Sequence, residues 1–429
     1  MNENQNFIKK GTTVFATKPF AYCLSSKYRT SVCDYCFKSG KLLRCCGCQY
    51  VYYCNQTCQK RSWRIHGKEC ANLKRISPKI VPDFVRLMAR IIIKLNQGGS
   101  EEIEYYDKTN FRRFKDLMSH YSDIKNDMKR AEHFLWVCHV LYEFLEDIPM
   151  PNCVELMGIY GRICINSFNI YNYEFTSIGV GIYLGASILD HSCKPNTVVV
   201  FEGTTIIVKT IEDLPCLDWS QIRISYIDVL QTTRDRRSEL QSRYYFWCRC
   251  KKCEEAEPMA EAAACPNKFC TYPCSPDAVV CESCNTKFPE DFKKIFDEIS
   301  DFTADNLDSM VDVAYLDVSK VCLAKQEGVL HSLNIQHLLT LRCAFESSIS
   351  LKHWEEADIY SKELLNGYLT YYGKIHPVTG LLILTTADIK LNMNESKEAI
   401  ELIKKASVIL KITHGEQHSI IKEYLNYII

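Results

Sequence analysis

The feature that most constrains this chain is the clustering of its cysteines. The 429 residues contain 24 cysteines, and most of them stand two to four residues from another cysteine. Two-residue spacing lets both thiolates of a turn bind one ion, and three-residue spacing places two ligands on one face of a helix. The N-terminal residues 1–5 are polar and lack the apolar core of a signal peptide, and no run of 18 apolar residues occurs. We therefore expect a protein of the cytoplasm and nucleus, with no membrane segment, in which reduced thiols bind zinc.

The first cluster occupies residues 33–70 and supplies eight ligands. A tetrahedral zinc ion takes four ligands, so eight ligands predict two ions, and a segment of about forty residues with little core needs such cross-links to fold. Cys46 is then a spare thiol. The ligands expected here are Cys33, Cys36, Cys45, Cys48, Cys54, Cys58, His66 and Cys70.

Two further clusters follow later in the chain. One is the triplet Cys248, Cys250 and Cys253, which needs a fourth ligand. The other cluster comprises Cys265, Cys270, Cys281 and Cys284, which are the expected ligands of a small zinc ribbon. Cys274 is an alternative ligand of the same ribbon.

Hydrophobic periodicity separates strand-rich from helical parts. Short strands are expected at 13–16 and 20–22, a hairpin at 198–208 with a glycine turn, and a strand at 222–226 that leads into Tyr226. Apolar residues at helical spacing predict helices within 79–150. The stripes are Val85, Leu87, Met88, Ile91, Ile92 and Leu95, and then Phe134, Leu135, Val137, Cys138, Leu141, Tyr142 and Leu145.

From about Asp291 the chain is helical and repeats itself with a period of 42 residues. Glu356-Ala357 recurs as Glu398-Ala399, and a Gly-x-x-His corner recurs from Gly373 to Gly415. Helical-hairpin repeats of tetratricopeptide type explain this period. His376 and His418 are therefore interpreted as corner residues of the repeats and not as catalytic groups.

The charges are balanced, because Lys+Arg and Asp+Glu both total 52. A dominant basic face for nucleic acid is therefore not expected. The end of the first cysteine cluster is locally basic, and a solvated helix face explains those charges better than phosphate contacts do. The residues concerned are Lys60, Arg61, Arg64, Lys68, Lys74 and Arg75.

The first cluster resembles a MYND finger, and the segment from Asp190 to Asn196 with the later Tyr226-x-Asp228 resembles the signature of SET-domain lysine methyltransferases. The order of motifs is similar to that of the SET-and-MYND methyltransferase family over nearly the whole chain. The resemblance implies an α+β fold, in which a β-rich SET domain is split by the MYND finger and a helical insert. The implied domains are 1–32 (start of SET), 33–70 (MYND), 71–160 (helical insert), 161–247 (core SET), 248–285 (post-SET and ribbon) and 286–429 (tetratricopeptide-like helices).

The same resemblance implies the site. The finger ligands interleave, so that Cys33, Cys36, Cys54 and Cys58 hold one zinc and Cys45, Cys48, His66 and Cys70 the other, and Cys193 completes the post-SET set. Tyr226 is the implied catalytic residue, beside a lysine channel lined by Phe168 and Tyr244. S-adenosylmethionine is the implied cofactor. The residues implied to hold it are Tyr106, Asn166, Ser187, Asp190, His191 and Phe246.

The sequence departs from the family pattern in three places. Residues 1–10 contain no glycine where the family has a Gly-x-Gly turn for the cofactor, so the chain is expected to enter the domain one strand late. Asp190 replaces an asparagine and, when ionised, accepts hydrogen bonds but donates none. Residues 218–221 replace a Gly-Glu-Glu turn.

The implied function is methylation of histone or other protein lysines by a monomer. A catalytically degenerate adaptor is the alternative, which binds proline-rich motifs through the finger and other partners through the helical repeats. A nucleic-acid-binding regulator is the weaker third interpretation.

The clusters together predict about four zinc ions per chain, by counting tetrahedral sites. Two belong to the finger, one to Cys193 with residues 248–253, and one to the ribbon. Metal analysis of protein purified without chelator measures this number. A stoichiometry near two would remove the post-SET and ribbon sites.

Overall fold

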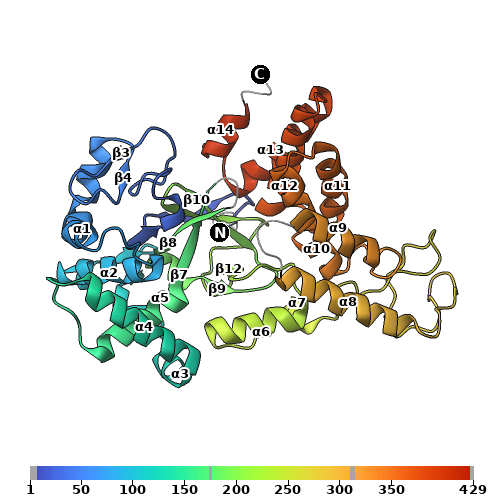
Figure 1. The fold of residues 1–429 in the computed structure, drawn as a ribbon, viewed down its shortest axis with the longest axis horizontal. Helices are drawn as coiled ribbons and strands as arrows, with labels where there is room; N and C mark the ends of the chain where they lie inside the picture. Colours follow the sequence, from blue (N-terminus) through green and yellow to red (C-terminus); the bar gives the residue numbers. More distant parts are fainter. Residues whose placement is uncertain (1–6, 173–175, 310–314, 426–429) are drawn as a thin grey trace, which may run out of the picture. The chain divides into compact units, whose positions relative to one another are not determined.

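A computed structural model describes residues 7–172, 176–309 and 315–425. These residues, whose helices and strands are labelled in Figure 1, form two compact units, each with its own buried cluster of apolar residues. The first unit comprises Met1–Asp190, Val199–Arg223 and Ser242–Tyr245, and the second comprises His191–Val198, Ile224–Gln241 and Phe246–Ile429. In the described part of the chain, no helix is both long and apolar enough to cross a membrane.

Small antiparallel sheets form the β-rich part. One sheet has the order β1-β11-β10, and a second has the order β2-β8-β7. The β-branched runs at 197–202 and 205–210 favour extended backbone, and Gly203 between them has a positive φ of 59° that suits the tight turn. The strands are β1 (Thr13–Thr17), β2 (Ala21–Leu24), β7 (Ser167–Tyr171), β8 (Ser177–Ile182), β10 (Thr197–Glu202) and β11 (Thr205–Thr210).

The cysteine-rich segment 33–70 contains a short hairpin and one long helix. The hairpin pairs β3 (Leu43–Arg44) with β4 (Tyr52–Tyr53). Helix α1 (Gln56–Arg75) starts at Asn55, whose side chain accepts a hydrogen bond of 2.8 Å from the backbone N–H of Cys58. An asparagine cap of this kind satisfies one of the free N–H groups of the first turn.

The helical insert has a well-buried centre. In α2 the apolar residues at 85, 87, 88, 91 and 92 are buried, as their spacing predicts. The expectation for the next stripe is partly wrong, because Leu135 and Tyr142 are 67% and 54% exposed while Phe134, Val137 and Leu141 are buried. Helix α4 buries one face only, and adjacent positions such as Phe134 and Leu135 do not both lie on that face. The insert contains α2 (Asp83–Asn96), β5 (Glu104–Tyr105), β6 (Phe111–Arg112), α3 (Tyr121–Asn126), α4 (Met128–Phe144) and α5 (Cys153–Asn166).

A buried cluster of four charged side chains joins the finger to α2. Arg86 donates from Nη1 to Asp34 Oδ1 at 2.8 Å and from Nη2 to Glu69 Oε1 at 2.7 Å. Arg90 bonds the same two carboxylates through Nη2, at 2.6 and 2.7 Å. Burial would raise the pKa of Glu69, but Arg86 and Arg90 outweigh it and hold that pKa well below its usual range. The two acids therefore stay ionised and the cluster is electrically neutral.

The strand expected at 222–226 is shorter than predicted. Only β12 (Arg223–Ile224) is extended, and it pairs with β9 (Asp190–His191). Tyr226 follows in a bend instead of lying within the strand. Helices α6 (Thr233–Tyr244) and α7 (Lys251–Glu254) come next.

Helices α8 to α14 form the C-terminal part, as the repeat pattern predicts. Gly373 and Gly415 have nearly the same left-handed φ, 92° and 97°, at the two corners. His376 and His418 each accept a hydrogen bond of 3.3 Å at Nδ1 from the backbone N–H two residues later, so both cap the helix that follows. The helices are α8 (Phe292–Ser309), α9 (Tyr315–Gln326), α10 (Ile335–Ser350), α11 (Trp354–Tyr371), α12 (Pro377–Asn392), α13 (Ser396–Thr413) and α14 (Ser419–Leu425).

We predict that Arg86→Met lowers the free energy of unfolding by about 3–5 kcal/mol, because it leaves two buried carboxylates with one guanidinium. Urea titration of the zinc-loaded chain measures the loss. Arg61→Met is the matched control, since Arg61 is exposed on α1, and we expect it to change stability by less than about 0.5 kcal/mol. Equal losses in the two variants would show that the buried cluster does not stabilise the finger.

Candidate functional site

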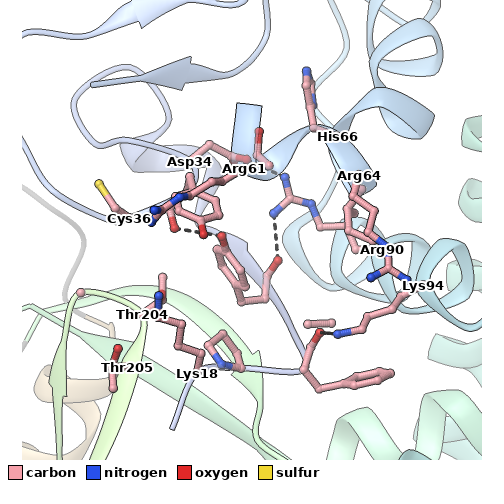
Figure 2. A pocket seen from close by; sticks show the side chains of 18 of the residues that line it. Lys18, Asp34, Cys36, Arg61, Arg64, His66, Arg90, Lys94, Thr204 and Thr205 are labelled. Carbon is pink, nitrogen blue, oxygen red and sulfur yellow. Dashed lines mark hydrogen bonds and ion pairs between the residues drawn. The ribbon is translucent and has the colours of Figure 1, made fainter. Parts of the chain in front are cut away.

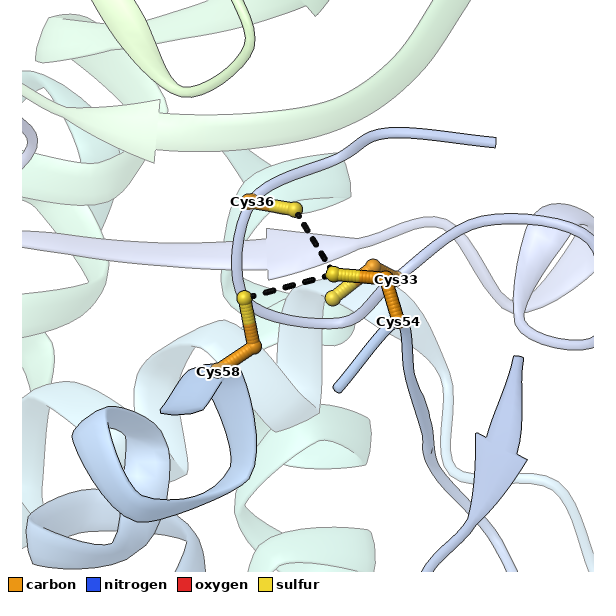
Figure 3. A group of neighbouring side chains, drawn as sticks. All are labelled: Cys33, Cys36, Cys54 and Cys58. Carbon is orange, nitrogen blue, oxygen red and sulfur yellow. Dashed lines mark hydrogen bonds between the residues drawn. The ribbon is translucent and has the colours of Figure 1, made fainter. Parts of the chain in front are cut away.

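The first group of ligands in the finger is Cys33, Cys36, Cys54 and Cys58, whose sulfur atoms converge (Figure 3). The Sγ–Sγ distances are 3.7 Å for Cys36–Cys54 and 3.4 Å for Cys54–Cys58. A tetrahedral site with zinc–sulfur bonds of about 2.3 Å separates its sulfurs by roughly 3.8 Å, whereas a disulfide requires about 2.05 Å. The spacing therefore fits a zinc ion and excludes a disulfide.

The second group is Cys45, Cys48, His66 and Cys70, all of them buried. His66 Nε2 lies 3.4 Å from Cys45 Sγ, while Nδ1 lies 3.2 Å from Glu69 Oε1. A proton on Nδ1 donated to Glu69 leaves the Nε2 lone pair for a metal, which is the usual way in which a carboxylate orients a ligating histidine. Gly47 leaves room for the site, because a Cβ there would lie 2.9 Å from Cys70 Sγ.

The third group joins distant parts of the sequence. Cys193 Sγ lies 4.0 Å from Cys248 Sγ and 3.5 Å from Cys253 Sγ, and Cys250 completes the set. The fully buried Arg236 points Nη2 at Cys253 Sγ from 3.7 Å. A guanidinium in that position stabilises a thiolate ligand.

The fourth group is Cys265, Cys270, Cys281 and Cys284. Its Sγ–Sγ distances are 3.5 Å for Cys265–Cys284 and 3.8 Å for Cys270–Cys281. Cys274 lies outside this group and donates from Sγ to the backbone oxygen of Tyr272 at 3.5 Å. The geometry therefore favours Cys270 over Cys274 as the ligand.

Three aromatic rings meet beside the third group. His191 lies 5.3 Å from Tyr226 and 5.9 Å from Phe246 between ring centroids, and Tyr226 contacts Phe246 edge to face at 6.5 Å. The backbone N–H of Tyr226 donates to His191 Nδ1 at 3.0 Å. Nδ1 is therefore the acceptor, and the ring proton sits on Nε2, 3.2 Å from Cys193 Sγ. His191 thus connects the metal ligand Cys193 to the backbone of Tyr226.

The charge state of His191 agrees with these contacts. Burial lowers the pKa of His191 to about 4. A neutral ring accepts through one nitrogen and donates through the other, as both hydrogen bonds require.

Asp228, two residues after Tyr226, is held by the helical repeats. Its Oδ2 accepts from Arg342 Nη1 of α10 at 2.8 Å, and its Oδ1 accepts from the Tyr372 hydroxyl at 2.5 Å and from the backbone N–H of Leu230 at 3.0 Å. Partial burial would raise the pKa of Asp228, but Arg342 and Tyr372 outweigh it and the pKa lies below its usual value. The loop after Tyr226 is therefore fixed from both ends, by His191 and by Asp228.

Sequence reasoning named Asp228 only as part of the Tyr226-x-Asp228 signature, and it did not find Arg342, Tyr372 or Arg236 as parts of the site. One signal was available, because Tyr372 occupies a repeat corner where the equivalent residue of the next repeat is His414. A difference at an otherwise matching corner indicates that the two corners have different partners.

The other residues implied to form the site lie in the first unit. Asn166 ends α5 and donates from Nδ2 to the backbone oxygen of Met118 at 2.7 Å, and Ser187 donates to Leu184 O at 2.6 Å. Tyr106 packs edge to face on Trp219, and Phe168 does the same on Tyr183.

Two more of the implied residues also belong to the first unit. Asp190 is exposed at the start of β9, and Tyr244 is half-buried at the end of α6. Of the implied catalytic and cofactor residues, the structure brings together His191, Tyr226 and Phe246 within the second unit.

Known proteins resemble this chain along most of its length. Residues 33–70 match the MYND finger family. The chain is 29% identical over 423 residues to the histone-lysine N-methyltransferase SMYD3 of Mus musculus, covering 97% of this chain and 92% of that protein. It is 28% identical to the histone-lysine N-methyltransferase ASHR1 of Arabidopsis thaliana (97% and 89% covered), and 25% identical to the N-lysine methyltransferase SMYD2-A of Xenopus laevis (96% and 92% covered). With four cysteine-rich groups at zinc spacing and relatives that match along nearly its whole length, the chain is similar throughout to the SET and MYND domain-containing family.

Proposed function

We propose that this protein transfers a methyl group from S-adenosylmethionine to the side-chain amine of a lysine in a protein substrate. The observation that carries the proposal is the contact of Tyr226 with His191 and Phe246, beside the third cysteine group. The named relatives are lysine methyltransferases, and they align over both units of this chain.

The aromatic residues fit the proposed cofactor. S-adenosylmethionine supplies a methyl group on a positively charged sulfur. Aromatic faces attract such a cation and also stack on an adenine ring. Phe246 and Tyr226 offer these faces, and the neutral His191 adds no competing positive charge.

The chain must also prepare the substrate amine. Lysine titrates near ~10.4 in water, and its amine is a nucleophile only after it has lost a proton to solvent. We assign to the Tyr226 hydroxyl the task of accepting a hydrogen bond from the amine and aiming its lone pair at the methyl carbon. The two anchors of the Tyr226 loop, His191 and Asp228, hold the backbone that carries this side chain.

Zinc has a structural part in this proposal. The third group ties Cys193, two residues after His191, to residues 248–253, which begin two residues after Phe246. One ion there holds two of the three rings in place. Without the ion, the segments that carry His191 and Phe246 would lose the cross-link that holds them together.

The remaining assignments in this proposal are carried over from the family resemblance. Phe168 and Tyr244 are assigned to the lysine channel, and Tyr106, Asn166, Ser187 and Asp190 to the cofactor. Histones and other lysine-bearing proteins are the proposed substrates, acted on in the cytoplasm and nucleus by a monomer. The finger is assigned to proline-rich peptide motifs.

We expect Tyr226→Phe to reduce methyl transfer by about 10²-fold or more, because one positioned hydrogen bond to the amine is lost. Calorimetry should give nearly unchanged affinity for S-adenosylmethionine. The assay uses radiolabelled cofactor with core histones and with a mixture of cytosolic proteins as acceptors. If Tyr226→Phe stays active while Tyr244→Phe does not, the catalytic assignment belongs to the wrong tyrosine.

Asp228 is a positioning residue in this scheme, and Tyr372→Phe tests it. Removing this hydroxyl frees one side of the Tyr226 loop, and we expect kcat to fall roughly tenfold, with KM and cofactor affinity unchanged. Tyr371→Phe is the matched control, since its hydroxyl bonds the backbone oxygen of Leu333 and not Asp228. An equal fall in both variants would mean that the corner serves stability alone.

A further inference from the structure

The first unit contains a cavity that the proposed chemistry does not use. Its volume is about 400 Å³, within the range of peptide and small-ligand pockets. Five separate segments line it: residues 18–22, the first loop of the finger, helix α1, the end of α2, and the β10–β11 turn. Figure 2 shows labelled side chains from each of these segments around the cavity.

The apolar part of the lining is formed by Pro19, Phe20, Tyr22, Tyr35 and Ile65. Two hydrogen bonds hold its shape. Arg90 Nη1 donates to the backbone oxygen of Tyr22 at 2.9 Å, and the Tyr22 hydroxyl donates to the backbone oxygen of Tyr35 at 2.9 Å. These contacts tie residues 18–22 to both the finger and α2, so the cavity is a formed feature and not a gap between loose loops.

The β10–β11 turn forms another wall of the cavity and touches the first loop of the finger. Gly203 stands there with a positive φ, and a Cβ at this position would lie 2.7 Å from the backbone oxygen of Cys36. Only glycine allows the turn to approach the finger this closely.

The rim of the cavity carries excess positive charge. Six cationic side chains but only two carboxylates line it. Arg90 is neutralised inside the buried cluster with Asp34, and Lys94 pairs with Glu102 at 2.6 Å. Lys18, Lys38, Arg61 and Arg64 remain, exposed and without a carboxylate partner among the described residues.

We propose that this cavity, hereafter the finger cavity, binds an acidic peptide segment of a partner protein. An apolar side chain of the partner enters between Phe20, Tyr35 and Ile65, and flanking carboxylates pair with Lys18, Arg61 and Arg64. The charge complementarity favours an acidic occupant. A nucleic acid fits less well, because the interior is apolar and concave and Glu202 lies on its wall.

The test measures binding between the full-length, zinc-loaded chain and a fluorescein-labelled peptide. The peptide has two leucines flanked by glutamates, and its fluorescence anisotropy reports the binding. Arg61→Glu combined with Arg64→Glu reverses two rim charges on exposed positions of α1. Lys60→Glu combined with Lys68→Glu is the matched control, since it makes the same change on the same helix outside the cavity lining.

We expect the Arg61/Arg64 variant to weaken binding by at least about tenfold, and the Lys60/Lys68 variant by less than about twofold. The peptide with serine in place of leucine should also bind at least about tenfold more weakly, because it leaves the cavity unfilled. Equal weakening by both variant pairs, or equal affinity of the serine peptide, would overturn the proposal. A duplex DNA probe is also tested against the peptide. If the DNA displaces the peptide, and both variant pairs weaken DNA binding equally, the occupant is a nucleic acid.

Discussion

The arrangement of the proposed site depends on one cross-link between distant parts of the chain. The sulfur of Cys193 meets those of Cys248, Cys250 and Cys253, so a metal ion closes a loop of 55 or more residues. Closing such a loop costs conformational entropy, which metal–thiolate bonds offset because a preformed site rarely exists in the unfolded chain. His191 reaches Cys193 with one ring nitrogen and the backbone of Tyr226 with the other. The metal site and the site of the proposed chemistry therefore form together.

The finger is attached to the rest of its unit by charge as well as by packing. His66 links a metal group to Glu69, and Glu69 bonds two arginines of α2 that lie in the protein interior. Such a cluster is costly to bury and is stable only when every member keeps its partner. The finger is thus an integral part of the first unit, and its orientation on α2 gives the finger cavity a fixed wall through Arg90.

The sequence was informative where the signal is local. Apart from Cys193 and Cys270, the ligands can be predicted because spacing specifies them, and spacing or turn chemistry also specifies the β10–β11 hairpin, the stripe on α2 and the two repeat corners. The exposed face of α4 and the short β12 were predicted incorrectly, since burial depends on neighbours that a periodic pattern does not identify. The contact of Asp228 with Arg342 and Tyr372 spans 114 and 144 residues, and no local rule pairs such positions. The choice between Cys270 and Cys274 likewise required three-dimensional geometry.

The two repeat corners have the same backbone conformation, but their side chains have different partners. Tyr372 of the first corner bonds Asp228, whereas the second corner has His414, which packs edge to face on His418. Solenoid arrays usually gain and lose units freely, because each unit contacts only its neighbours. Here the helical repeat that carries Tyr372 also bonds Asp228 in the Tyr226 loop, so another repeat cannot replace it without losing this contact. A repeat inserted or removed before that corner would carry Tyr372 away from Asp228, so this contact anchors the helical array at one point along its length.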